Sequence, residues 1–215
     1  MEVSVYVPPL FREDQVPVLH EFIRQQPLAT LVTHGPSGLF ASHLPLLVDA
    51  EPAPFGTLSG HLARANPHWQ EAPTGTEALA VFTGPQAYIT PSWYATKQET
   101  GKVVPTWNYA AVHAYGTLRF FDDEASLLKL VTRLTATHEA KRAQPWAVSD
   151  APPDFVRGML RAIVGFELTL TRLEGKWKMS QNRPPVDVPR VVEGLKHDGE
   201  EAAAAVVAER NRGRG

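Results

Sequence analysis

The sequence contains no cysteine among its 215 residues. Disulfide bonds and thiolate metal ligands are therefore excluded, and nothing points to an oxidising compartment. The histidines at positions 43, 61, 68 and 113 are the remaining candidates for metal ligands, but no pair has the close spacing of a helical zinc motif. We therefore expect no metal site.

A surplus of basic residues is also missing. The chain has 21 Lys and Arg against 23 Asp and Glu, a formal net charge of −2. Because neutralised phosphates supply most non-specific affinity for DNA, this balance argues against direct DNA binding. No apolar run approaches the ~20 residues of a membrane-spanning helix, and the first residues lack the pattern of a signal peptide. The sequence thus predicts a cytoplasmic protein with no membrane partner.

Short apolar and alternating segments separated by turn residues dominate the chain. Helical spacing predicts helices over Asp14–Gln25, over a segment capped by Asp122-Asp123-Glu124 that runs to about Arg142, and over Pro153–Arg161. The predicted strands are Ala29–Thr33, Leu39–Asp49, Phe55–Leu62, Glu77–Thr83, Ala87–Thr90, Thr106–Phe121, Ile163–Thr171 and Trp177–Ser180. Many short strands with a few helices predict a mainly β fold with peripheral helices (α+β), a barrel in outline.

The end of the chain has a different composition. Residues 198–215 are charged and alanine-rich and end in Arg-Asn-Arg-Gly-Arg-Gly. We expect a single domain over residues 1–197, followed by a tail that is disordered or a frayed helix.

The segment Gly60–Pro67 combines a strand end, a turn and the start of a helix. Backbone N–H groups at a helix start attract anions, and Arg64 beside them can grip a phosphate. The glycines of a P-loop or a dinucleotide-binding fingerprint are missing. The alternative is that Arg64 and Asn66 only cap a surface helix.

Three further segments carry polar groups that suit a ligand. In Ser42-His43-Leu44-Pro45, small and polar residues interrupt a strand and leave room for a ligand edge; the alternative is a satisfied core histidine. Aromatic and polar residues mix in Pro91–Tyr94 and Pro105–Tyr109, which suits a planar ligand, a subunit interface or ordinary loop anchors. Lys176–Arg183 is rich in polar residues after a strand, which suits a loop that closes over a ligand; the alternative is a solvated loop.

These segments together resemble the PaiB family of FMN-binding negative transcriptional regulators. The resemblance covers about residues 1–195 and leaves the tail outside. It is carried, in order along the chain, by Tyr6–Phe11, Ser42–Pro45, Gly60–Pro67, Tyr88–Tyr94, Val104–Tyr109, Ile163–Glu167 and Lys176–Arg183. It implies an FMN-binding split β-barrel similar to pyridoxamine-phosphate oxidase, forming a homodimer with FMN at the subunit interface.

The resemblance also implies which residues contact the cofactor. Arg64 and Asn66 would hold the phosphate and ribityl end, and Ser42, His43 and Leu44 would lie along the flavin ring. The same segment as Arg64 adds His61 and Ala63. Contacts from the second subunit or a closing segment would come from Ser92, Trp93, Tyr94, Asn108, Gln181, Asn182 and Arg183.

Three functions are compatible with this pattern. The first is a transcriptional regulator or flavin-dependent sensor, and the second is a flavin-dependent oxidoreductase in which the cofactor performs the redox step. The third is a repressor that touches the duplex directly, which the charge balance and the lack of a visible helix-turn-helix disfavour.

Overall fold

The computed structural model describes residues 5–214, so the first four residues of the expected domain and the last residue of the expected tail lie outside it. The chain divides into two compact units. The barrel unit consists of Val16–Phe82 and His113–Leu173. The second unit consists of the described residues of Met1–Gln15, Thr83–Val112 and Glu174–Gly215. The expectation of one domain over residues 1–197 stays a prediction.

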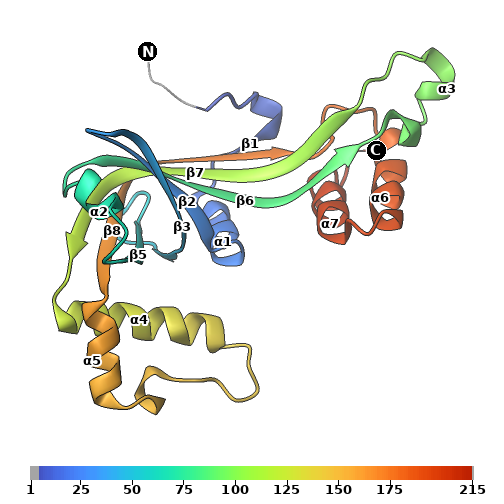
Figure 1. The fold of residues 1–215 in the computed structure, drawn as a ribbon. Coiled ribbons are helices and arrows are strands. Elements are labelled where there is room, and N and C mark those ends of the chain that lie inside the picture. The colour runs from blue at the N-terminus through green and yellow to red at the C-terminus, as the bar shows by residue number, and fades with distance from the viewer. Residues whose placement is uncertain (1–4, 215) are drawn as a thin grey trace. The chain divides into compact units, whose positions relative to one another are not determined.

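An antiparallel sheet of eight strands forms the centre of the fold (Figure 1). Seven strands follow in the order β3 (Gly38–Pro45), β2 (Leu28–Gly35), β6 (Glu77–Ile89), β7 (Thr106–Phe121), β8 (Ile163–Lys178), β5 (Thr57–Ala63) and β4 (Leu47–Asp49). The short β1 (Arg12–Glu13) pairs with β8. The prediction of a mainly β fold is confirmed, and β7 has the bounds expected from its alternation.

Two predicted interruptions of the sheet are wrong. The turn expected at Gly84-Pro85 lies within β6, and the gap expected after Thr171 lies within β8. In β6, the pairing with β2 ends at Phe82. Pro85 comes after this residue, so its missing N–H removes no hydrogen bond between β6 and β2. In β8, Gly175 pairs with Glu13 of β1, which extends the strand past the predicted end.

The barrel unit is built on a hairpin and a helix. The turn predicted at residues 34–38 joins β2 and β3, and α1 (Val16–Gln25) begins two residues after its predicted start. The side chains of Leu31, Ala80 and Phe82 are fully buried, which gives this unit an apolar core. α2 (His68–Glu71) follows β5 at the predicted turn.

Two helices of the barrel unit connect β7 to β8. α4 (Glu124–Glu139) begins where predicted, since the Asp123 side chain accepts a hydrogen bond of 2.9 Å from the backbone N–H of Ser126. It ends at Glu139, three residues before the predicted end. α5 (Pro153–Arg161) has its predicted bounds, and the short helix η3 (Val148–Asp150) precedes it.

The second unit contains the C-terminal helices α6 (Asp187–His197) and α7 (Glu201–Arg210), which pack against each other (Figure 1). The prediction of a disordered or frayed tail is wrong for residues 201–210. Three side chains of α7 are buried, those of Ala203, Ala204 and Val207. Arg210 also forms a 2.7 Å ion pair with the buried Glu13. The alanines that suggested a disordered tail therefore form a packing face of a helix.

Short elements complete the second unit: η1 (Pro9–Phe11), η2 (Pro91–Trp93) and α3 (Lys97–Thr100). Within residues 5–214, no helix has the length and apolar character needed to cross a membrane.

Candidate functional site

A buried polar cluster in the barrel unit centres on His68. Its side chain is fully buried, and both ring nitrogens have partners: Nδ1 lies 2.8 Å from Ser42 Oγ, and Nε2 lies 2.9 Å from Thr33 Oγ1. Asn66 Nδ2 donates to Ser42 Oγ over 3.1 Å, and Asn66 Oδ1 accepts from the His68 backbone N–H over 3.0 Å. Burial lowers the pKa of His68, which favours the neutral ring. Two strands, the turn after β5 and the start of α2 are tied together here.

This cluster changes the interpretation of the Ser42–Pro45 segment. One alternative for this segment was a core histidine with hydrogen-bonded ring nitrogens. Such a histidine is present, but it is His68 and not His43. His43 is exposed, because it alternates with the inward Ser42 on β3, and Leu44 is partly buried. No local pattern indicates this partnership, since Ser42 and His68 are 26 residues apart.

The Arg64 guanidinium is engaged within the barrel unit. Nε donates to the Arg161 carbonyl over 2.9 Å, and Nη2 donates to the Ile163 carbonyl over 3.1 Å. Both terminal nitrogens also contact Asp122 Oδ2, at 3.3 and 3.4 Å. The side chain therefore holds the turn between α5 and β8. An incoming phosphate would compete with Asp122, whose side chain is 67% exposed.

Polar atoms without partners lie on β5. His61 Nδ1 and Ser59 Oγ are buried, and neither has a hydrogen-bond partner among residues 5–214. The two residues are on the same face of the strand. Leu47, which pairs with Ser59, packs against Leu130 and Leu134 of α4. Burial lowers the pKa of His61, so its ring also favours the neutral form.

In the second unit, Arg183 stacks on Tyr94. The guanidinium carbon lies 4.2 Å from the ring centroid, and Nη2 donates to the Val104 carbonyl over 3.2 Å. The Tyr94 hydroxyl and Arg183 Nε are buried without a hydrogen-bond partner among the described residues. Burial raises the pKa of Tyr94, and the Arg183 charge opposes this rise.

Asn108 and Gln181 shape the turn after β8. The fully buried Asn108 donates from Nδ2 to Ser180 Oγ over 2.8 Å, while its Oδ1 has no partner among residues 5–214. Gln181 bridges the turn, with Nε2 donating to the Trp177 carbonyl and Oε1 accepting from the Met179 N–H, both over 2.6 Å. These bonds accompany a left-handed Ser180, at φ 66°.

Lys178 was not among the residues expected to bind the cofactor. Burial lowers the pKa of its ammonium group, and the charges of Lys176 and Arg183 lower it further. Lys178 Nζ donates to Thr106 Oγ1, and no carboxylate among the described residues forms an ion pair with it. This concentration of positive charge favours an anion.

The predicted contacts therefore form two sets, one in each unit. The barrel unit brings Ser42 and Asn66 together around His68, keeps Arg64 at the α5–β8 turn, and leaves Ala63 and His43 exposed. The second unit joins Tyr94 to Arg183 and Asn108 to Ser180, whereas Ser92 and Asn182 are exposed. Trp93 packs against Gly194 of α6, where any side chain would clash with its ring.

The family model described as "Putative FMN-binding domain" matches residues 5–172. The chain belongs to this family. The match confirms the resemblance found in the sequence and, at the level of the family, the flavin cofactor that the resemblance implied.

Curated relatives cover nearly the whole chain. An uncharacterised protein of Emericella nidulans is 37% identical, with 94% of each chain covered. The "Protease synthase and sporulation protein PAI 2" of Bacillus subtilis is 31% identical, with 90% of each chain covered. The alignment to this relative extends well past the family match and includes most of the second unit.

Solved structures share the fold at low identity. A flavocytochrome of Azotobacter vinelandii superposes with a TM-score of 0.54 and 13% identity, covering 78% of this chain and 69% of that one. A conserved hypothetical protein of Mycobacterium tuberculosis superposes with a TM-score of 0.55 and 12% identity, covering 84% and 94%. The expected split-barrel fold is confirmed.

Proposed function

We propose that this protein binds FMN and acts as a transcriptional regulator or flavin-dependent sensor of the PaiB type. The family match over residues 5–172 carries the proposal. Bound FMN would supply a redox-active ring, and the chain's own residues would bind and orient it. The regulatory role rests on the resemblance to the PaiB family, and the Bacillus subtilis relative is named for protease synthesis and sporulation.

The unpartnered polar atoms are the local support for a ligand. Buried polar groups are almost always hydrogen-bonded, so in the barrel unit His61 Nδ1 is a candidate to meet a polar atom of FMN, and in the second unit Asn108 Oδ1 and the Tyr94 hydroxyl are separate candidates. Arg64 stays the predicted contact to the phosphate, and Lys178 and Arg183 are further candidates because their charges are close together. The residues present therefore fit an anionic, planar cofactor.

The proposal predicts a yellow protein that titrates with FMN. We expect flavin absorption bands in the freshly purified protein, and quenching of FMN fluorescence when the stripped protein is titrated with FMN. A colourless protein that does not quench FMN fluorescence would contradict FMN binding.

The same preparation separates the sensor from an enzyme. A sensor predicts slow reduction of bound FMN by NADH and NADPH, whereas catalytic turnover would establish the oxidoreductase alternative. Regulation without direct DNA contact predicts no sequence-specific mobility shift at low salt; a salt-sensitive specific shift would overturn that part of the proposal.

The homodimer is part of the proposal and has a candidate interface in the second unit. Tyr88 and Trp107 are 51% and 48% exposed, and their ring centroids lie 6.3 Å apart. Val104, close by in sequence, is 65% exposed. Paired exposed aromatics are typical of the anchors at protein interfaces.

We expect Trp107→Asp to convert a dimer into a monomer in light scattering coupled to gel filtration, because a charge would replace an interfacial ring. Trp146→Asp is the matched control, since Trp146 is 49% exposed and lies in the barrel unit. A monomeric wild-type protein, or a Trp107→Asp variant that stays dimeric, would contradict this interface.

A further inference from the structure

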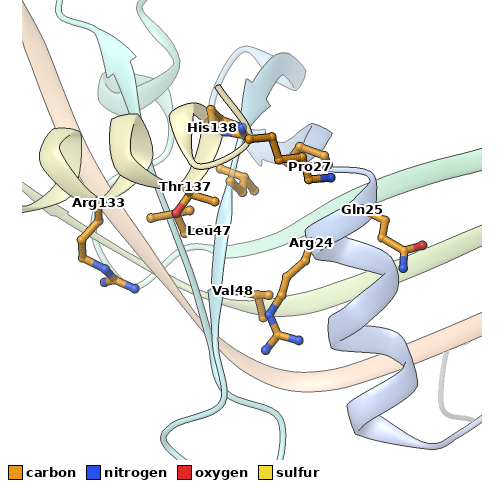
Figure 2. A pocket seen from close by; sticks show the side chains of 10 residues that line it. Arg24, Gln25, Pro27, Leu47, Val48, Arg133, Thr137 and His138 are labelled. Carbon is orange, nitrogen blue, oxygen red and sulfur yellow. The ribbon is translucent and has the colours of Figure 1, made fainter. Parts of the chain in front are cut away.

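A cavity of about 360 Å³ lies in the barrel unit, and none of the residues predicted to bind FMN lines it. Its walls come from the end of α1, from β4 with the preceding residues, and from the last turns of α4 (Figure 2). Ten residues line it: Arg24, Gln25, Pro27, Leu46, Leu47, Val48, Arg133, Thr137, His138 and Lys141. The volume is within the usual range of small-molecule sites, roughly 300–1,000 Å³.

One part of the cavity lining is apolar and fixed. Leu46 and Leu47 are 1% and 8% exposed, so their positions are set by the core. The Leu46 backbone N–H donates to the Pro27 carbonyl over 2.9 Å, which ties the start of β4 to the segment after α1. This surface can contact the apolar body of a ligand without rearrangement.

The charged part of the lining has one sign. Arg24 projects from α1, and Arg133, Thr137 and His138 project from α4 (Figure 2). Lys141 follows the end of α4, and no Asp or Glu belongs to the described lining. Positive groups from two helices therefore surround an apolar surface.

Nearby carboxylates hold these cations only loosely. Arg133 pairs with Asp49 at 2.6 Å and Arg24 pairs with Glu21 at 3.4 Å, in both cases between side chains that are 42–57% exposed. Exposed ion pairs of this kind contribute about 0–1 kcal/mol, so a ligand anion can replace them at little cost. Lys141 and His138 form no ion pair with a carboxylate within residues 5–214.

We propose that this cavity binds a small organic anion, with an apolar body against Leu46, Leu47 and Val48 and a phosphate or carboxylate group between Arg24 and Lys141. None of the residues predicted to bind FMN lines this cavity, and the proposal does not depend on FMN binding. A compact aromatic monophosphate combines the required size, apolar surface and charge, so phenyl phosphate is a suitable probe.

Isothermal titration of the full-length protein with phenyl phosphate tests the proposal. We expect saturable binding to the wild type, and a loss of about tenfold or more in affinity for the double variant Arg24→Ala/Lys141→Ala, because charge-assisted contacts are removed. The double variant Lys129→Ala/Arg142→Ala loses the same charge at positions that do not line the cavity, and it should bind like the wild type.

Two further ligands test the parts of the proposal. Benzoate, with the same body and a carboxylate, should also bind, whereas inorganic phosphate should bind more weakly because it lacks the apolar body. No saturable binding of phenyl phosphate, equal losses in the two double variants, or inorganic phosphate binding as tightly as phenyl phosphate would overturn it.

An FMN titration of the same variants separates this site from the proposed function. FMN affinity should be unchanged in Arg24→Ala/Lys141→Ala. A parallel loss of FMN affinity would place the cofactor itself in the cavity and overturn the claim of a second site. If the protein bound phenyl phosphate but no FMN, this site would stand and the proposed function would fail.

Discussion

Replacing His68 by leucine is expected to lower the free energy of unfolding by about 3 kcal/mol. The substitution keeps a buried side chain of similar volume but removes both hydrogen bonds of the ring, to Ser42 and Thr33. Each buried group left without a partner costs about 1–3 kcal/mol. Ser42 keeps its hydrogen bond from Asn66, so the total loss is smaller than for two groups without any partner. The midpoint and slope of urea unfolding, followed by tryptophan fluorescence, measure the change.

His43→Ala is the matched control for this prediction. His43 is the neighbour of Ser42 on β3 but its side chain is exposed. Surface substitutions of this kind change the free energy of unfolding by about 0.5 kcal/mol or less. Equal losses in the two variants would show that the buried cluster around His68 contributes little to stability.

Two histidines, His68 and His61, contribute to how stability responds to acid. Burial lowers the pKa values of His68 and His61 in the folded protein below the ordinary value of 6.5. The unfolded chain therefore binds more protons as the pH falls below 6.5. The stabilisation is complete above that pH and is lost as the pH falls towards the folded-state pKa values. His68→Leu should lose less stability between pH 7 and pH 5 than the wild type does.

Local patterns predicted the elements that depend on local chemistry. α4 begins at a capping aspartate, α5 begins with proline, and β7 alternates over its whole length, so each start was predicted correctly. The wrong boundaries depend on partners distant in sequence. Pro85 is tolerated in β6 because pairing with β2 has already ended at Phe82, a fact that no local window contains.

The same distinction applies to the candidate site. Ser42 and Asn66 were selected as cofactor contacts, which stays a prediction, and their common partner His68 was missed because it is a tertiary contact. Lys178 was not among the predicted contacts, because its burial comes from the surrounding fold and no local pattern indicates it. The prediction for the C-terminal helix was wrong for a related reason, since an alanine face is buried only where another helix covers it.

Arg64→Ala is expected to weaken FMN binding about 10- to 100-fold, as for the loss of a charge-assisted contact of about 1.5–3 kcal/mol. Titration of the stripped variant with FMN, followed by flavin fluorescence, measures the effect. The variant should also lose about 1 kcal/mol of stability, because the carbonyls of Arg161 and Ile163 lose a donor at a site that is partly exposed. An unchanged affinity would show that the phosphate binds elsewhere.

Asp122→Asn distinguishes a phosphate contact from a purely structural arginine. Asp122 is the only carboxylate among the described residues that forms an ion pair with Arg64. A phosphate bound by Arg64 would compete with Asp122, so removing the negative charge should strengthen FMN binding while leaving the carbonyl contacts of Arg64 in place. If Arg64 served only the α5–β8 turn, Asp122→Asn would leave FMN affinity unchanged, and the loss in Arg64→Ala would scale with its loss of stability.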